Sequence, residues 1–212
     1  PVRLLLIADG MGGCNAGEVA SATAVEAFTK YVEEKLPLEL DNPEKLLTHA
    51  VDAANRAVFE LANEKMIEMG TTLVAVLIDT KRIYVVHVGD SRAYLLRKKD
   101  IFPLTIDHSY VMELVRLGSI TAEEAAVHPK RNIITRAVGI KEEVEADITT
   151  YSIKKGDVLL LCSDGLSGMM KDEEMQEIIK RKITFEKKAE KLVEEANARG
   201  GYDNITLILA EV

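Results

Sequence analysis

The chain lacks the features that would suggest a membrane, secreted or nucleic-acid-binding protein. It contains no apolar run of about 18 residues and no signal-peptide pattern, so neither a membrane span nor a leader is expected. The formal net charge of −8 argues against nucleic acid or an anionic membrane as a partner, because both would require a basic face. An acidic chain can still bind phosphate where metal ions reverse the local field.

Cysteine is scarce as well. The two cysteines, Cys14 and Cys162, lie far apart and form no CxxC motif, which fits a reducing cytoplasm. Linkers, repeats and low-complexity segments are also missing, and 47% apolar content lets the 212 residues bury one sizeable core. The sequence therefore predicts a single domain over residues 1–212. Because residue 1 is Pro rather than Met, we expect a chain trimmed at its N-terminus.

Two apolar runs end in the same way, with an Asp-Gly pair and a further glycine, at residues 4–13 (LLLIADGMGG) and 159–168 (LLLCSDGLSG). A third apolar strand pattern begins just after Asp203. One Asp-Gly pair is more often a turn than a ligand, but its repetition favours a shared role for Asp9, Asp164 and Asp203. Three strand-end carboxylates indicate a divalent cation. Oxygen ligands suit Mg²⁺ or Mn²⁺, whereas zinc would need histidine and cysteine clusters that the sequence lacks.

The hydrophobic periodicity predicts an α+β protein in which helices come in pairs and strands in runs. We expect helices at 16–36, 42–70, 108–118, 121–127, 172–182 and 184–198. We expect strands at 4–8, 71–78, 82–88, 92–97, 146–151, 157–162 and 205–212. The first helix should stop before Pro37, and strands 71–97 should form an antiparallel meander. Hairpins cannot build a doubly wound parallel sheet, so the prediction is a four-layer αββα sandwich with two antiparallel sheets.

Two further carboxylates stand out, and each has a structural explanation. Asp90 lies in a Gly-Asp-Ser turn between strands, and we expect it to order that turn rather than bind metal. Asp107 precedes a predicted helix and could cap it near Ser109.

A set of ordered motifs carries a resemblance to a known family. They are DGMGG with its AGEVAS helix, GTTLVAVLI, VHVGDSRAYLL, DHSYV, HPKRNIITRAVG, LLLCSDGLSG and GYDNITLILAEV. In this order they resemble the bacterial branch of the metal-dependent, type 2C protein phosphatases over residues 4–212. The fold that the resemblance implies, a two-sheet sandwich flanked by helices, agrees with the element order predicted above.

The resemblance also implies roles for particular residues. Asp9 would bridge two metal ions, with the Gly10 carbonyl on the second ion and Asp164 and Asp203 on the first. Asp107 would bind a third, weaker ion together with Asp164. Asn204 would support the loop that carries Asp203.

The implied activity is hydrolysis of phosphoserine and phosphothreonine in proteins, opposing a bacterial serine/threonine kinase. Two ions, Mn²⁺ or Mg²⁺, about 3.5–4 Å apart would activate a shared water for in-line attack on phosphorus. The protein would be a cytoplasmic monomer whose partners are phosphorylated proteins, without nucleic acid or membrane. Neither cysteine is followed by the basic loop of a cysteine-based phosphatase, so we expect both to be packing residues.

Two features depart from the family. Its members normally begin with an extra strand that carries a phosphate-binding Arg and an acidic residue near the second metal, whereas this sequence begins inside the next strand. The bacterial motif often has His where this chain has Cys14, and a thiol is a poor substitute for imidazole near pH 7. The alternatives are therefore a pseudophosphatase acting as an interaction domain, or a phosphatase of an anti-sigma-factor antagonist.

The segment 108–136 contains short helices with few large apolar residues. Short, sparsely anchored helices open at low cost. We therefore expect a mobile flap beside the metal site that contributes to the choice of protein substrate, with an ordinary surface connection as the alternative.

Overall fold

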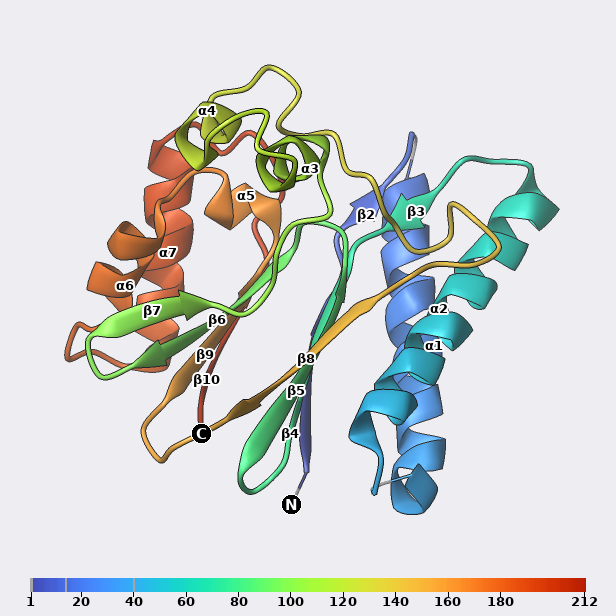
Figure 1. The fold of residues 1–212 in the computed structure, drawn as a ribbon, viewed down its shortest axis with the longest axis horizontal. Helices are drawn as coiled ribbons and strands as arrows, with labels where there is room; N and C mark the ends of the chain where they lie inside the picture. Colours follow the sequence, from blue (N-terminus) through green and yellow to red (C-terminus); the bar gives the residue numbers. More distant parts are fainter. Residues whose placement is uncertain (1, 14, 40) are drawn as a thin grey trace.

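Two four-stranded antiparallel sheets pack face to face, and helices cover their outer surfaces (Figure 1). This computed structural model describes residues 2–13, 15–39 and 41–212. The helices are α1 (Ala16–Glu39), α2 (Pro43–Lys65), α3 (Tyr110–Arg116), α4 (Ala122–Ala126), α5 (Asp164–Ser167), α6 (Asp172–Ile179) and α7 (Phe185–Ala198). The strands are β1 (Arg3–Ile7), β2 (Gly10–Met11), β3 (Gly70–Thr71), β4 (Leu73–Ile78), β5 (Arg82–Val88), β6 (Arg92–Arg97), β7 (Asp100–Pro103), β8 (Asp147–Ser152), β9 (Val158–Cys162) and β10 (Leu207–Glu211). The predicted αββα sandwich is confirmed.

The first sheet has the strand order β1-β4-β5-β8, and the second has the order β10-β9-β6-β7. In Figure 1, α1 and α2 lie against the first sheet, while α6 and α7 lie against the second. The short pair β2–β3 lies at the same end of the sandwich as α3, α4 and α5 (Figure 1). Among the described residues, no helix combines the length and apolar character needed to cross a bilayer.

Strand β4 shows why this sequence forms a sandwich. All six of its residues are buried, as the nearly continuous apolar pattern predicts. Successive side chains of a strand point to opposite faces, so Leu73 and Leu77 pack with α1 and α2, whereas Val74 and Val76 pack between the sheets. A strand that is apolar on both faces is stable only when both faces are covered.

Several helix boundaries follow from capping chemistry that the sequence displays. The Asn42 side chain accepts a hydrogen bond from Lys45 N at 3.2 Å and precedes Pro43 at the first position of α2. Thr121 and Glu124 form the predicted capping box at the start of α4.

The first helix does not stop before Pro37, as predicted, but continues to Glu39. Proline fixes φ near −65°, a helical value, and removes only one backbone donor. The rest of α1 is anchored by buried side chains such as Phe28 and Val32, so the helix persists through its last turn.

The predicted meander is also wrong, because β6 leaves the first sheet and pairs with β7 and β9 in the second. Gly89, with φ of +101°, lies between β5 and β6. A Cβ there would lie 2.7 Å from Cγ2 of Thr72, so only glycine fits. Strand β6 is apolar on both faces: Leu95 packs between the sheets and Leu96 packs towards α5–α7, so β6 can lie inside the second sheet. Elements β2, β7 and α5 are too short for the sequence pattern to predict them.

One buried polar residue fastens a loop to α2. Asn55, which is 2% exposed, donates hydrogen bonds from Nδ2 to the carbonyls of Lys141 (3.0 Å) and Glu142 (2.9 Å). Its Oδ1 accepts from Gly139 N at 2.7 Å. Segment 139–142 therefore has a fixed position on the helix.

We expect Asn55→Ala to lower the free energy of unfolding by about 2–4 kcal/mol, because it leaves buried backbone groups without partners. Denaturant unfolding measures the change. Thr48→Ala is the matched control on the same helix, since its hydroxyl makes one exposed bond to Glu44 O, and it should change stability by no more than about 0.5 kcal/mol. Equal losses in the two variants would show that Asn55 does not anchor the loop.

Candidate metal centre

The backbone around Asp9 is tied to the start of β4. Asp9 N donates to Oγ1 of Thr72 at 3.0 Å, and Thr72 N donates to the Asp9 carbonyl at 2.8 Å. The Thr72 hydroxyl is also hydrogen-bonded to the hydroxyl of Ser91, at 2.7 Å, in the turn that follows Asp90. The end of β1 and the Gly-Asp-Ser turn are therefore held together, which brings the carboxylates of Asp9 and Asp90 towards one region.

Gly10 is required by close packing against helix α1. A Cβ on Gly10 would lie 1.8 Å from the Gly17 carbonyl oxygen, and a Cβ on Gly17 would lie 2.6 Å from the Gly10 carbonyl oxygen. The first turn of α1 and strand β2 thus meet backbone to backbone. This contact explains the glycine that follows Asp9 and sets the direction of the chain there.

Asp164 opens helix α5 directly after β9, and the loop that carries Asp203 packs against it. The Ser163 hydroxyl donates to Asn204 O at 3.0 Å and accepts from Thr206 N at 3.1 Å. A Cβ on Gly165 would lie only 2.2 Å from Asn204 O. The second Asp-Gly pair therefore also uses its glycine for a backbone contact, here one that places Asp203 beside Asp164. Asn204 supports this loop through its main-chain carbonyl.

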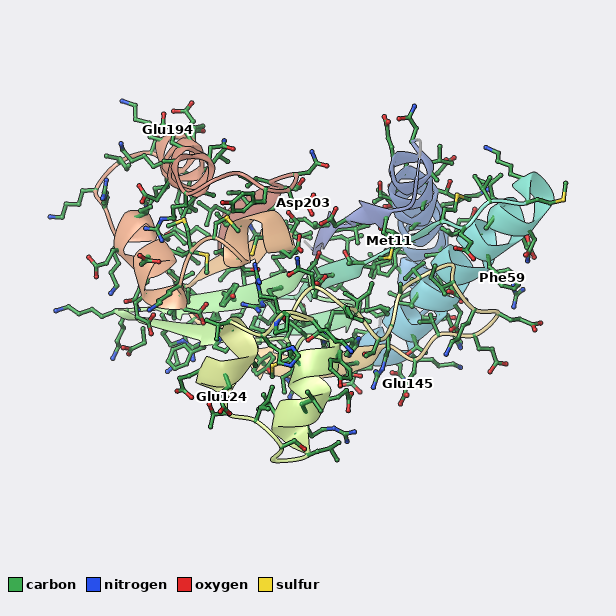
Figure 2. The ribbon with its side chains drawn as sticks, turned by 90° about the horizontal axis from the view of Figure 1, so that it is seen from above. Met11, Phe59, Glu124, Glu145, Glu194 and Asp203 are labelled. Carbon is green, nitrogen blue, oxygen red and sulfur yellow. The ribbon has the colours of Figure 1, made fainter. Side chains whose placement is uncertain are left out.

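Asp9, Asp164 and Asp203 lie near enough for their charges to interact, as their strand-end positions predict. Burial, followed by repulsion from Asp164 and Asp203, raises the pKa of Asp9 to about 7. Burial and repulsion from Asp203 likewise raise the pKa of Asp164. Figure 2 shows the sandwich from above, with Asp203 near the middle and Met11 of strand β2 beside it in this view.

Asp90 joins these three carboxylates, and we call the four of them the acidic cluster. Burial, followed by repulsion from Asp164 and Asp107, raises the pKa of Asp90 to about 7. The expectation that Asp90 only orders a turn overlooked its position, because it follows the buried strand β5 as Asp9 follows β1 and Asp164 follows β9. The same strand-end criterion could have found it.

The residues of the acidic cluster fit a hard divalent cation. Oδ1 of Asp164 is buried and has no hydrogen-bond partner among the described residues. A buried oxygen without a partner is costly, and so are neighbouring carboxylates that repel one another. Both costs are removed when a cation binds between them, and an all-oxygen donor set is what Mg²⁺ and Mn²⁺ prefer.

Asp107 differs from the residues of the acidic cluster because its carboxylate is paired with an arginine. Its carboxylate accepts two hydrogen bonds from Arg92, from Nε at 2.8 Å and from a terminal nitrogen at 2.7 Å. It does not cap α3, because the Ser109 side chain accepts from Met112 N and is itself the cap. The capping alternative is therefore wrong, while a role of Asp107 in binding a third ion stays a prediction.

A second group of potential ligands, distant in sequence, also comes together. The rings of His87 and His108 stack with centroids 4.5 Å apart, and Asp147 Oδ2 lies 3.4 Å from His108 Nε2. Their ligand atoms lie within 4.8 Å of one another. Arg136, however, lies 2.7 Å from Asp147 Oδ1 and 3.3 Å from His108 Nε2, so a guanidinium cation already neutralises the carboxylate.

His87, His108 and Asp147, with Arg136, therefore form a structural contact rather than a metal site. His108 Nδ1 accepts from Gly89 N at 3.2 Å, next to Asp90, while Arg136 lies at the end of segment 108–136. Burial lowers the pKa of both His87 and His108, which keeps the stacked rings neutral. Both ends of the segment are thus fixed to the sheets close to the acidic cluster.

The cysteines have separate outcomes. Cys162 is fully buried beneath α5–α7, and burial raises the pKa of its thiol to about 12, so the predicted packing role is confirmed. Cys14 lies outside the described residues, and its packing role stays a prediction.

Comparison with known proteins identifies the family. The sequence profile described as Protein phosphatase 2C matches residues 2–208, and the chain belongs to this family. The serine/threonine phosphatase stp of Listeria monocytogenes is 41% identical over 211 residues, which cover 98% of this chain and 84% of that protein. The crystal structure of the Mycobacterium tuberculosis phosphatase PstP/Ppp matches with a TM-score of 0.92 and 40% identity, covering 99% of this chain and 88% of that one. A catalytic domain of PstP in complex with 2 manganese ions matches with a TM-score of 0.87 and 39% identity, covering 99% and 87%.

We expect Gly10→Ala to lower the free energy of unfolding by about 1–3 kcal/mol, because its methyl group would overlap the Gly17 backbone. The backbone shift should also weaken Mn²⁺ binding, measured by calorimetric titration. Gly13→Ala is the matched control in the same motif, since a Cβ there meets no atom within 4 Å. Identical behaviour of the two variants would contradict the packing role of Gly10.

Proposed function

We propose that the chain is a metal-dependent protein phosphatase that hydrolyses phosphoserine and phosphothreonine in proteins. The observation that carries the proposal is the acidic cluster with its unpartnered buried oxygen on Asp164. Family membership and bacterial relatives that are named serine/threonine phosphatases support the same activity. The presence of Asp9, Asp164 and Asp203 favours an enzyme over the non-catalytic interaction domain.

In this proposal Asp9, the Gly10 carbonyl, Asp164 and Asp203 would hold the metal ions. When bound, Mn²⁺ or Mg²⁺ supplies the positive charge that attracts the anionic phosphate and lowers the pKa of water. A PstP catalytic domain holds two manganese ions, which supports a two-ion site here. The identity and number of the ions belong to the proposal.

The residues of this chain orient the site and leave the attack to water. The Gly10–Gly17 and Gly165–Asn204 backbone contacts hold the carboxylates at set positions, so little rearrangement is needed when ligands bind. Cys162 offers no nucleophile, because it is buried and burial raises its pKa to about 12. Among the described residues, no cysteine is therefore available to form a covalent intermediate.

Segment 108–136 is proposed as a flap that contributes to the choice of protein substrate. Its helices α3 and α4 each bury a single side chain, Val111 and Ala125, within the described residues. Leu117 (70%) and Val127 (79%) are exposed apolar side chains that a protein substrate could cover. The partners of this proposal are phosphoproteins, among them a serine/threonine kinase, and the domain acts as a cytoplasmic monomer without nucleic acid or membrane.

We expect Asp9→Asn and Asp203→Asn to reduce Mn²⁺-dependent hydrolysis of p-nitrophenyl phosphate by roughly a hundredfold or more, because each removes a ligand charge with little change of volume. Turnover is measured with and without Mn²⁺. Asp52→Asn, an exposed carboxylate on α2, is the matched control and should keep normal turnover. Retention of turnover in either ligand variant would refute the proposed metal centre.

The third, weaker ion predicted at Asp107 has a second candidate ligand in Asp90. Because Arg92 already neutralises Asp107, we expect Asp90→Asn to shift the Mn²⁺ dependence of turnover more than Asp107→Asn. Asp107→Asn should mainly lower the melting temperature, since it breaks a half-buried ion pair. Mn²⁺ activity curves and thermal unfolding of the two variants separate the roles. A lower turnover number in Asp107→Asn, with unchanged stability, would instead assign the weak ion to Asp107.

A further inference from the structure

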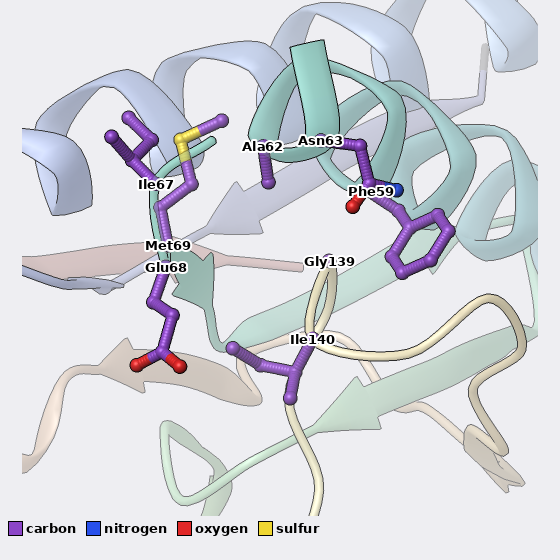
Figure 3. Close-up of a pocket in the computed structure, with 8 residues that line it drawn as sticks. All are labelled: Phe59, Ala62, Asn63, Ile67, Glu68, Met69, Gly139 and Ile140. Atoms are coloured by element: carbon purple, nitrogen blue, oxygen red, sulfur yellow. The ribbon is translucent and has the colours of Figure 1, made fainter. Parts of the chain in front are cut away.

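We propose that a groove beside α2 docks a basic, apolar segment of a phosphoprotein substrate. One part of the groove is a cavity of about 290 Å³ between the end of α2 and the loop after Val138. Figure 3 shows Phe59 of α2 and Ile140 of this loop on either side of Gly139, with Ile67 farther along the cavity. Most residues that line this cavity are apolar, and the polar ones are Asn63 and Glu68.

Exposed apolar side chains mark this part as a contact surface. Ile140 is 49% exposed and Ile67 is 40% exposed. Met66, immediately before Ile67, is 92% exposed and has a left-handed φ of 52°, which is uncommon for a long side chain. Apolar side chains that gather around a cavity, with water on one side, are typical of sites that bind a partner.

The adjoining part of the groove is strongly acidic. It has a volume of about 550 Å³, shares Phe59 and Asn63 with the first part, and is lined by carboxylates with a single guanidinium, Arg56. The carboxylates are Glu60, Glu64, Glu142 and Glu143. None of these four forms a salt bridge within residues 2–13, 15–39 and 41–212.

Together the two parts select the chemistry of the occupant. Unpaired carboxylates on one wall attract lysine or arginine and repel acidic segments, while the apolar cavity accepts an aliphatic or aromatic side chain. A segment that carries both, such as an amphipathic helix with a basic face, meets both requirements.

The walls of the groove are already in place. Asn55 holds segment 139–142 through three hydrogen bonds. A Cβ on Gly139 would lie 2.2 Å from Cγ1 of Val58, so the loop packs directly on α2. A preformed groove binds a partner without a large ordering cost.

The groove adjoins the proposed metal centre, and we therefore assign its occupant to a substrate. This inference rests on the proposed function. Thr71 pairs with Gly10 on one side and with Val138 on the other. In Figure 2, Met11 of β2 lies between Asp203 and Phe59. A substrate chain that leaves the acidic cluster can therefore continue into the groove.

Direct binding is tested by fluorescence anisotropy on the Mn²⁺-loaded chain. The probe is an unphosphorylated fluorescein peptide of leucines flanked by lysines, and its partner peptide has glutamate at each lysine. We expect the chain to bind the lysine peptide and not the glutamate peptide. Either Ile140→Glu or the pair E60K and E64K should weaken the affinity for the lysine peptide roughly tenfold. Leu38→Glu (78% exposed) and the pair E33K and E34K on α1 are matched controls that should change the affinity less than about twofold. Thermal unfolding checks that each variant is folded.

The link to substrates is tested with a phosphothreonine peptide, with and without the lysine-leucine segment on a flexible linker. The segment should lower KM about fivefold at constant kcat, and Ile140→Glu should abolish this difference. Equal weakening in the α1 controls, binding of the glutamate peptide, or an unchanged KM would each overturn the docking proposal. Hydrolysis of p-nitrophenyl phosphate by the unaltered chain tests the proposed function separately, because that ester carries no basic, apolar segment to dock.

Discussion

Repulsion between carboxylates held together at one end of the sandwich is the constraint on which the rest of the structure depends. Burial and the neighbouring charges raise the pKa of Asp9 and Asp90 to about 7, so without a cation these groups lower the stability of the fold as the pH rises from about 4 to 7. The apolar layer between the sheets and the two outer helical layers must outweigh this cost. A divalent cation would convert the repulsion into attraction, which links metal binding to stability.

Backbone contacts keep the carboxylates in place. The two Asp-Gly pairs share a pattern because each glycine lets another segment approach closely, but the partners differ: Gly10 meets α1, whereas Gly165 meets the loop of Asp203. Two hydroxyl groups complete the arrangement: Thr72 Oγ1 accepts a hydrogen bond from Asp9 N, and the Ser163 hydroxyl donates one to Asn204 O. The charged groups are thus positioned by uncharged parts of the chain, which do not compete with a cation for the carboxylate oxygens.

The residues around the proposed metal centre are linked to one another at the same end of the sandwich. His108 connects the Asp90 turn with Arg136 and Asp147, and the chain after Arg136 pairs with Thr71 before it forms one wall of the groove beside α2. The acidic cluster, segment 108–136 and the groove are therefore successive parts of one connected surface. A protein substrate that contacts all three would be recognised well beyond its phosphorylated residue.

The sequence by itself determined the layers, most elements and three of the four clustered carboxylates, because apolar periodicity, capping residues and strand ends are local signals. Only the tertiary structure decided that β6 joins the second sheet, that Asp90 belongs to the cluster and that Arg92 neutralises Asp107. It also brought His87, His108 and Asp147 together around Arg136. These relations depend on packing between segments far apart in the chain, and hydrophobic pattern does not encode which of several apolar strands will be neighbours.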